Sequence, residues 1–321
     1  IQNNSTMSPE ESRDRANLFN KYFHSVFTTD NDIPPPLEIH GVNPIEPLRI
    51  NEAGIFDLLL KTKIKKQPGP DNIPNEFLTR YTEWVTKYLF IIFNMSLTKS
   101  SLPNDWKIAQ VIPILKSGSE ADVANYRPIS LTSTICKIFE HIILKHITTY
   151  LENENILTPS QHGFRKGLST VTQLTELIHE LSSAIDHQKQ IDLISLDFSK
   201  AFDRVSHQKL MEKLQVTIGK GPITNWIRAY LTKRTQFVKI DQQTSELTEV
   251  TSGVPQGGVL APILFLIFIN DLPQSIGTNI KLFADDCIIY KEINSPSDHM
   301  VLSNALLSVS DWCTKWQMTI T

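Results

Sequence analysis

Four consecutive residues, Phe283-Ala284-Asp285-Asp286, carry the clearest chemical signal in this sequence. Apolar, β-prone runs flank them at Ile280–Leu282 and Cys287–Tyr290, so the pattern predicts a hairpin with two acids at its tip. Successive strand side chains point to opposite faces, so only a turn brings both carboxylates near one point. Paired acids repel unless a cation lies between them, and Mg²⁺ or Mn²⁺ is the natural occupant. Taken alone, the pair equally fits ordinary turn chemistry, because Asp is favoured in turns.

A third acid on another strand would favour the metal interpretation. Residues Ile191–Leu196 alternate like a buried strand, and Asp197 follows at its end. Ser199 could then cap a helix running through the 200s. One acid at a strand end and two in a neighbouring hairpin is the layout of two-metal phosphoryl transfer. Asp203 would point elsewhere on a helix, so we expect it to be structural.

A Gly- and Pro-rich turn, Ser252–Pro262, lies between these acids and opens into the apolar segment Ile263–Ile269. Glycines let backbone approach a bound nucleotide closely, and a helix beginning there offers free N–H groups to phosphate. Gln256 is an uncharged donor and acceptor at the mouth of the turn. The alternative is a buried helix with a flexible entry. The apolar segment is too short to span a membrane.

The three segments resemble motifs A, B and C of reverse transcriptases, in the non-LTR (LINE-type) branch and close to its jockey-like members. They are Asp197–Asp203, Pro255-Gln256-Gly257 and Phe283–Asp286. Upstream motifs of that family follow in the expected order: Pro68–Pro74, Trp106-Lys107 with Val111–Gly118, Asn125–Leu131 and Gln161–Thr170. The resemblance runs from about Ile50 to about Trp316. So many motifs in one order are far more specific than a single Asp-Asp hairpin.

The resemblance implies an α+β fold of the right-hand polymerase type. Helical fingers would cover about residues 46–190, and a palm with a small antiparallel, ferredoxin-like sheet would cover about 191–321. Residues 1–45 would form a helical extension, from about Pro9 to Phe27, and a Pro-rich linker at Asp32–Leu37. The sequence stops before the end of motif D and the thumb of this family, so we expect a fragment lacking both.

The resemblance also assigns roles to individual residues. Asp197, Asp285 and Asp286 would be the catalytic ligands of two Mg²⁺ or Mn²⁺ ions, with the Phe198 backbone carbonyl as a further ligand. Phe202 would lie beneath the sugar and exclude a 2′-hydroxyl by shape, unless it is ordinary core beside Ala201. The remaining substrate contacts would be Gln256 and Gly257 at the nucleotide or template, Ala284 at the primer terminus, and Lys116 and Arg127 at the triphosphate.

In the coarse element pattern helices dominate the first half, and a small antiparallel sheet carries the acids in the second. Expected helices cover 51–66, 75–100, 133–153, 170–189, 206–215, 222–233, 260–270 and 298–316. Expected strands cover 191–197, 236–241 and 246–251, with the hairpin near 285.

The net charge of −3 is unexpected for a nucleic-acid-binding protein. Residues 1–60 hold nine acidic and four basic side chains, so the rest is slightly basic. Lys61, Lys63, Lys65 and Lys66 could track a phosphate backbone, or they could be ordinary solvated charges. The three cysteines form no CxxC pair and fit a reducing compartment.

The sequence thus predicts an RNA-directed DNA polymerase with an RNA template, a DNA primer and deoxynucleoside triphosphates as partners. We expect no membrane segment, no targeting signal and an intracellular location, nuclear or cytoplasmic. A longer retrotransposon protein would supply an endonuclease and the thumb. The alternative is a catalytically impaired or domesticated nucleic-acid-binding relic of the same fold. The intact acids favour the polymerase, and the truncation favours the relic. The bulky Phe202 disfavours a third possibility, an RNA-dependent RNA polymerase.

Overall fold

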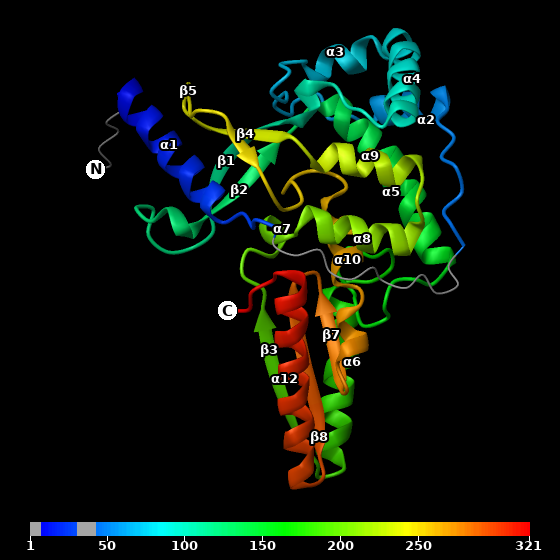
Figure 1. The fold of residues 1–321 in the computed structure, drawn as a ribbon, viewed down its shortest axis with the longest axis vertical. Helices are drawn as coiled ribbons and strands as arrows, with labels where there is room; N and C mark the ends of the chain where they lie inside the picture. Colours follow the sequence, from blue (N-terminus) through cyan, green and yellow to red (C-terminus); the bar gives the residue numbers. More distant parts are fainter. Residues whose placement is uncertain (1–7, 31–42) are drawn as a thin grey trace.

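The computed structural model describes residues 8–30 and 43–321, which form an α+β fold built around two separate sheets (Figure 1). The Pro-rich linker expected at Asp32–Leu37 lies outside the described residues. Within the described ranges, no helix has the length and apolar character needed to cross a membrane.

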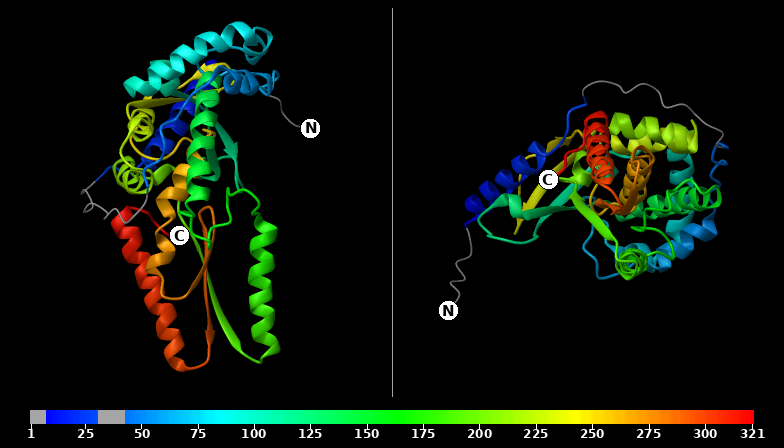
Figure 2. Two further views of the ribbon diagram at one scale, coloured as in Figure 1. Left: turned by 90° about the vertical axis from the view of Figure 1, so that its right-hand side faces the viewer. Right: turned by 90° about the horizontal axis from the view of Figure 1, so that it is seen from below.

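The smaller sheet carries the predicted acids. Its strands are β3 (Gln190–Asp197), β7 (Asn279–Phe283) and β8 (Asp286–Ile293), all antiparallel in the order β3-β8-β7. The predicted hairpin is therefore confirmed, with its turn at Ala284 and Asp285. Two long helices, α6 (Thr170–Asp186) and α12 (Pro296–Trp316), flank the strands on opposite sides, as the left view of Figure 2 shows.

The larger sheet joins the two halves of the chain. Its strands are β1 (Ile108–Leu115), β2 (Tyr126–Leu131), β4 (Arg234–Ile240), β5 (Gln243–Thr244) and β6 (Thr248–Val250). Their order is β2-β1-β4-β5, with β6 also paired to β4 and with β1 parallel to β4. Helices dominate the first half of the chain, as expected, but no strand was expected in its Val- and Ile-rich segment after residue 107, which forms β1 and β2.

Helix α1 (Pro9–Ser25) confirms the helical opening and packs across the larger sheet (Figure 1). Ser8 and Glu11 form a reciprocal capping box at its start. Phe19 and Phe23 are buried on its inner face in a small apolar cluster with Val111, Tyr126 and Val238. The amphipathic spacing seen in the sequence therefore buries this helix against a sheet formed by distant residues.

The remaining helices surround the main core. They are α2 (Glu52–Leu60), α3 (Asn75–Arg80), α4 (Thr82–Lys99), α5 (Thr134–Asn153), α8 (His207–Ile218), α9 (Pro222–Leu231) and α10 (Ala261–Ile269), with short turns η1 (Asn104–Lys107), η2 (Val123–Asn125), α7 (Ala201–Arg204) and α11 (Leu272–Ser275). Apart from Pro262, every residue of α10 is buried. The apolar run after the Gly-rich turn is therefore core, as either sequence interpretation required.

Candidate active site

Asp197 and Asp286 are direct cross-strand partners in the β3–β8 ladder. The Asp197 carbonyl accepts hydrogen bonds from the Thr321 backbone N–H (2.9 Å) and hydroxyl (3.0 Å), on the outer edge of β3. Since its carbonyl points away from β8, Asp197 forms a non-hydrogen-bonded pair with Asp286, the pair type with the closer side chains. Both carboxylates lie on one face of the sheet. The structure therefore brings these two predicted acids together.

Asp285 occupies the β7–β8 turn beside this pair. Its pKa is raised, first by burial and then by the negative charges of Asp286 and Asp197; a hydrogen bond from its own backbone N–H and the charge of Arg127 oppose the shift. Asp285 thus lies close enough to Asp197, Asp286 and Arg127 to interact with their charges. Among the residues that the structure describes, no three His, Cys, Asp or Glu side chains already form a group able to hold a metal ion.

The buried side chain of Gln161 holds the turn that carries Asp285. Gln161 Oε1 accepts from the backbone N–H groups of Ala284 (2.9 Å) and Gly163 (2.8 Å), and its Nε2 donates to the Ala284 carbonyl (3.1 Å). Ala284 has a φ of 56°, a left-handed conformation that a side chain rarely adopts. A Cβ at Gly163 would lie 2.4 Å from Ala284 N, so no larger residue fits there without a shift.

The sequence marks Gln161–Thr170 as a motif but does not reveal the role of Gln161. The available signal was a polar residue followed two positions later by glycine, ahead of a helix cap. That signal does not identify Ala284, the hydrogen-bond partner of Gln161, which is more than a hundred residues away in the sequence. The predicted role of Ala284 at the primer terminus stays a prediction, and its side chain is buried in the described structure.

The backbone of Phe198 is fixed by the last residues of the chain. Ser199 N–H donates to the Thr319 carbonyl (2.8 Å), and Thr321 N–H donates to Asp197, so Phe198 and Ile320 pair between these two bonds. Backbone carbonyls alternate in direction along a strand. The Phe198 carbonyl therefore points away from the C-terminal segment and toward the side on which β8 lies. This direction is compatible with the predicted use of the carbonyl.

Phe202 lies in α7 with its ring held between two others. It stacks on Phe265 of α10, with centroids 4.6 Å apart and planes 19° apart, and meets Phe164 edge-on at 6.3 Å. Phe202 is half-buried, whereas Phe164 is exposed. The ring is therefore fixed in position but not enclosed by the core, and its predicted contact with a sugar remains a prediction.

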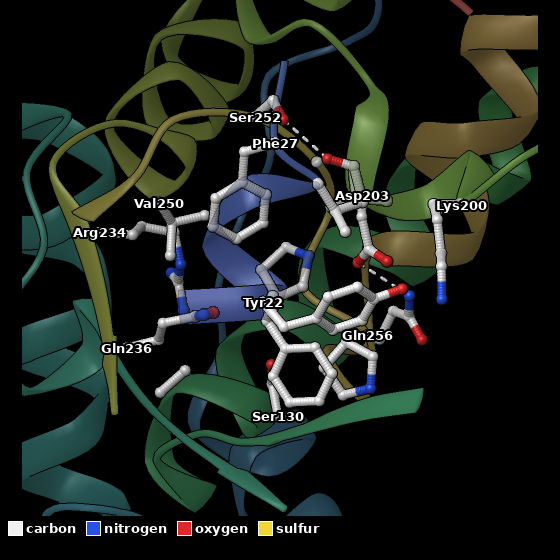
Figure 3. Close-up of a pocket in the computed structure, with 17 residues that line it drawn as sticks. Tyr22, Phe27, Ser130, Lys200, Asp203, Arg234, Gln236, Val250, Ser252 and Gln256 are labelled. Carbon is white, nitrogen blue, oxygen red and sulfur yellow. Dashed lines mark hydrogen bonds between the residues drawn. The ribbon is translucent and has the colours of Figure 1, made fainter. Parts of the chain in front are cut away.

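Gln256 is bound to Asp203 rather than to any of the three acids. Its Nε2 donates to Asp203 Oδ1 at 2.8 Å, and the Ser252 hydroxyl donates to the Asp203 carbonyl at 2.7 Å. Burial raises the Asp203 pKa to about 6, although the Gln256 hydrogen bond and the Lys200 charge oppose the shift. Figure 3 shows both side chains at a cavity of about 30 Å³ that Tyr22 of α1 also lines. Asp203 therefore links the first motif to the Gly-rich turn.

The Gly-rich turn is held from two further directions. Gly257 has a φ of 104°, and a Cβ there would lie 2.7 Å from the Ser130 carbonyl of β2. Glu140 of α5, fully buried, accepts from the N–H groups of Val259 (2.7 Å) and Leu260 (3.1 Å) through Oε2. A carboxylate at the start of α10 complements the helix dipole. Glu140 was not predicted as a functional residue, because in the sequence it resembles an ordinary polar residue of an amphipathic helix.

The two predicted triphosphate contacts belong to the β1–β2 hairpin. Arg127 is exposed on β2, and its charge lowers the pKa of Asp285, so it lies within electrostatic reach of the acids. Lys116 follows β1, where its backbone N–H donates to the Asn125 carbonyl at 2.8 Å and its side chain is exposed. No described contact links Lys116 to the acids.

The chain matches one family model and several known proteins. Residues 114–321 match the family model described as reverse transcriptase (RNA-dependent DNA polymerase). The chain is 29% identical, over 96% of its length and 36% of the relative, to the probable RNA-directed DNA polymerase from transposon BS of Drosophila melanogaster. It is 31% identical, over 87% of its length and 31% of the relative, to the corresponding probable polymerase from transposon X-element of that fly.

A third relative is the RNA-directed DNA polymerase from mobile element jockey of Drosophila funebris. It is 29% identical over 97% of this chain and 34% of the relative. The chain thus spans about a third of the length of these curated relatives.

Proposed function

Because the chain belongs to the reverse transcriptase (RNA-dependent DNA polymerase) family, we propose that it catalyses RNA-directed DNA synthesis within a non-LTR, jockey-like retrotransposon protein. The observation that carries this proposal is the pairing of Asp197 with Asp286 beside the turn that holds Asp285. Two carboxylates opposite each other and a third in the adjacent turn suit phosphoryl transfer, whose catalysis consists of positioning and charge stabilisation.

In this proposal the smaller sheet is the palm, and the larger sheet with α2 to α5 forms the fingers. The fingers would cover about 46–190 and the palm about 191–321, with residues 1–45 as an extension. Strands β4 to β6, although within the second range, belong to the larger sheet, because β4 pairs with β1 and both β5 and β6 pair with β4. We propose that further segments of a longer protein complete the grip on primer and template, since the relatives are about three times as long.

The acids would hold two divalent cations, Mg²⁺ or Mn²⁺, with the Phe198 carbonyl as a further oxygen ligand. Such an all-oxygen donor set suits hard cations. The raised pKa of Asp285, caused in part by Asp286 and Asp197, supports this fit, because a cation would relieve the repulsion. When bound, the cations would supply activation of the primer hydroxyl and stabilisation of charge on the phosphates.

The other site residues would position the substrates. The primer 3′-oxygen forms a bond to the α-phosphorus of a deoxynucleoside triphosphate, while the bond to pyrophosphate breaks. Arg127 and Lys116 would bind the triphosphate oxygens. Phe202 would lie beneath the sugar, and Gln256 with Gly257 would contact the nucleotide or template. Ala284, next to Asp285, would adjoin the primer terminus.

Primer extension tests this proposal. The purified chain is incubated with a DNA primer annealed to an RNA template, deoxynucleotides and Mg²⁺, and products are resolved on a gel. We expect extension by the natural sequence, none by Asp285→Asn, and unchanged extension by Asp311→Asn, an equivalent change at an exposed position of α12. Extension by Asp285→Asn at the natural rate would refute the assigned chemistry.

One observation favours the second candidate, a nucleic-acid-binding relic. The described acids do not already form a metal-holding group of three. Under that alternative the chain binds primer–template but extends it at no Mg²⁺ or Mn²⁺ concentration. The same experiment, run with a binding measurement beside it, separates the two.

A further inference from the structure

Phe164 is an exposed aromatic residue beside the candidate active site, in the segment that joins α5 to α6. It is 58% exposed, and its only ring contact with a described residue is the edge-on contact with Phe202. A single exposed apolar side chain is ordinary on a protein surface. The backbone conformation of Phe164 is what sets this residue apart.

The backbone of Phe164 is left-handed, with a φ of 56°. For a bulky side chain this conformation is strained, and such strain persists mainly at functional sites. Ser100 and Gln317 have similar φ values because each ends a helix, where a left-handed residue is common. Phe164 ends no helix, and within residues 8–30 and 43–321 it is the only aromatic residue with a positive φ. Its conformation therefore needs another explanation.

The chain just before Phe164 is held firmly in place. His162 N–H donates to the Leu282 carbonyl of β7 at 2.9 Å. Gly163 N–H donates to Gln161 Oε1 at 2.8 Å, and the same Gln161 side chain also holds the β7–β8 turn. The strained residue thus follows a rigid support that is tied to the turn carrying one of the acids.

Phe164 lies between two predicted substrate positions. The resemblance described above assigns Ala284 to the primer terminus and Phe202 to the sugar of the incoming nucleotide. Phe164 approaches Ala284 only through the backbone of its neighbour Gly163, whereas its own ring meets the Phe202 ring with centroids 6.3 Å apart. The exposed ring therefore adjoins the predicted position of the incoming nucleotide.

We propose that the Phe164 ring packs against the nucleoside of the incoming deoxynucleotide, as a second aromatic contact beside Phe202. The inference rests on the proposed function for its ligand. Aromatic rings bind nucleosides through apolar contact and stacking. A ring that is already held rigidly loses little freedom on binding, and burial of its exposed surface would offset the backbone strain. The ring carries no charge, so the contact is with the nucleoside and not with the phosphates.

Equilibrium binding of dATP tests this contact without catalysis. The primer ends in a 2′,3′-dideoxynucleotide, which has no 3′-hydroxyl to react, and the RNA template presents U opposite the incoming base. Isothermal titration calorimetry in Mg²⁺ then gives the Kd for dATP. Phe164→Leu should raise this Kd about fivefold or more, the lower end of the effect of removing a ring that contacts a base. Phe164→Tyr keeps the ring and should match the natural chain.

Two controls separate a nucleoside contact from general damage to the site. Phe77→Leu makes the same change at another exposed phenylalanine, on α3, and should leave the Kd for dATP unchanged. Inorganic tripolyphosphate has no nucleoside, so the Phe164→Leu variant and the natural chain should bind it equally.

An unchanged Kd for dATP in Phe164→Leu would overturn the proposal. An equal loss of affinity for dATP and tripolyphosphate would also overturn it, because the change would then distort the whole site. Weaker binding of primer–template alone, with dATP binding intact, would assign the ring to the primer and overturn it too. If Phe164→Leu weakens dATP binding but the natural chain extends no unblocked primer, the proposal stands and only the proposed catalysis is refuted.

Discussion

Asp197 and Asp286 lie directly opposite each other in the β3–β8 ladder, and their carboxylates share one face of the sheet. Like charges in such a pair destabilise an antiparallel sheet. The fold therefore carries a local electrostatic cost at the position where the proposed chemistry needs negative charge.

Replacing Asp286 by Asn should stabilise the metal-free chain while abolishing primer extension. Removing the repulsion from Asp197 should raise the free energy of unfolding by about 0.2–1 kcal/mol at neutral pH, the usual range for a cross-strand pair. Urea unfolding in the presence of a chelator measures this. Asp311→Asn, on the exposed surface of α12, should leave both quantities unchanged. A destabilised Asp286→Asn variant would show that the two carboxylates do not repel.

Asp203 should make stability fall as pH rises from about 4 to about 6. Its pKa is raised from 3.8 to about 6, so in this window the native state binds a proton that the unfolded state has lost. Asp203→Asn keeps the oxygen that accepts from Gln256 and removes this titration. The difference in unfolding free energy between variant and natural chain should therefore grow with pH across the window and level off near pH 7. A constant difference would contradict the buried position of the carboxyl.

Substitution of Phe202 by Val should admit ribonucleotides. If the ring lies beneath the sugar, shortening it removes the collision with a 2′-hydroxyl and affects deoxynucleotide use less. Single-nucleotide incorporation with each substrate measures the ratio of kcat/KM. Phe265→Leu is the matched control, because it removes the stacking partner and leaves the Phe202 ring in place. If both variants keep the natural discrimination, Phe202 serves packing alone.

Adding one methyl group at Gly163 should impair extension without unfolding the chain. The new Cβ would lie 2.4 Å from Ala284 N and so displace the turn that carries Asp285. A shift of about 1 Å in a catalytic group can cost about a hundredfold in rate. Extension rate and thermal unfolding are compared with Gly277→Ala, where a Cβ meets nothing within 4 Å. Equal rates in the two variants would show that the turn tolerates the displacement.

The acids could be predicted from the sequence because their signals are local. The hairpin around Phe283–Asp286 and the strand ending at Asp197 each follow from a short, continuous stretch of sequence. The side chains that hold these segments in place could not be predicted. Gln161 accepts a hydrogen bond from Ala284 and Glu140 accepts one from Leu260, and the two residues of each pair are more than a hundred positions apart. No local pattern names such a partner.

The larger sheet shows the same limit. Strand β1 carries Pro113 opposite Pro128 of β2, and proline usually argues against a strand interior. Its parallel pairing with β4 depends on a segment far along the chain.

The expected helix over 75–100 breaks at Tyr81, whose φ of −107° and ψ of 31° are not helical. Several residues around that break are apolar although they are exposed, so the spacing of apolar residues in the sequence did not reveal the break.

The parallel pairing of Ile108 with Thr235 also constrains how the chain folds during its synthesis. At translation rates of roughly 5–20 residues per second, β1 emerges from the ribosome roughly 6–25 s before its partner β4. During that interval the β1–β2 hairpin has an open edge, which can pair with other chains. Ribosome-bound chains that end before β4 should therefore be cleaved by protease within this hairpin, and chains extended past β6 should be protected.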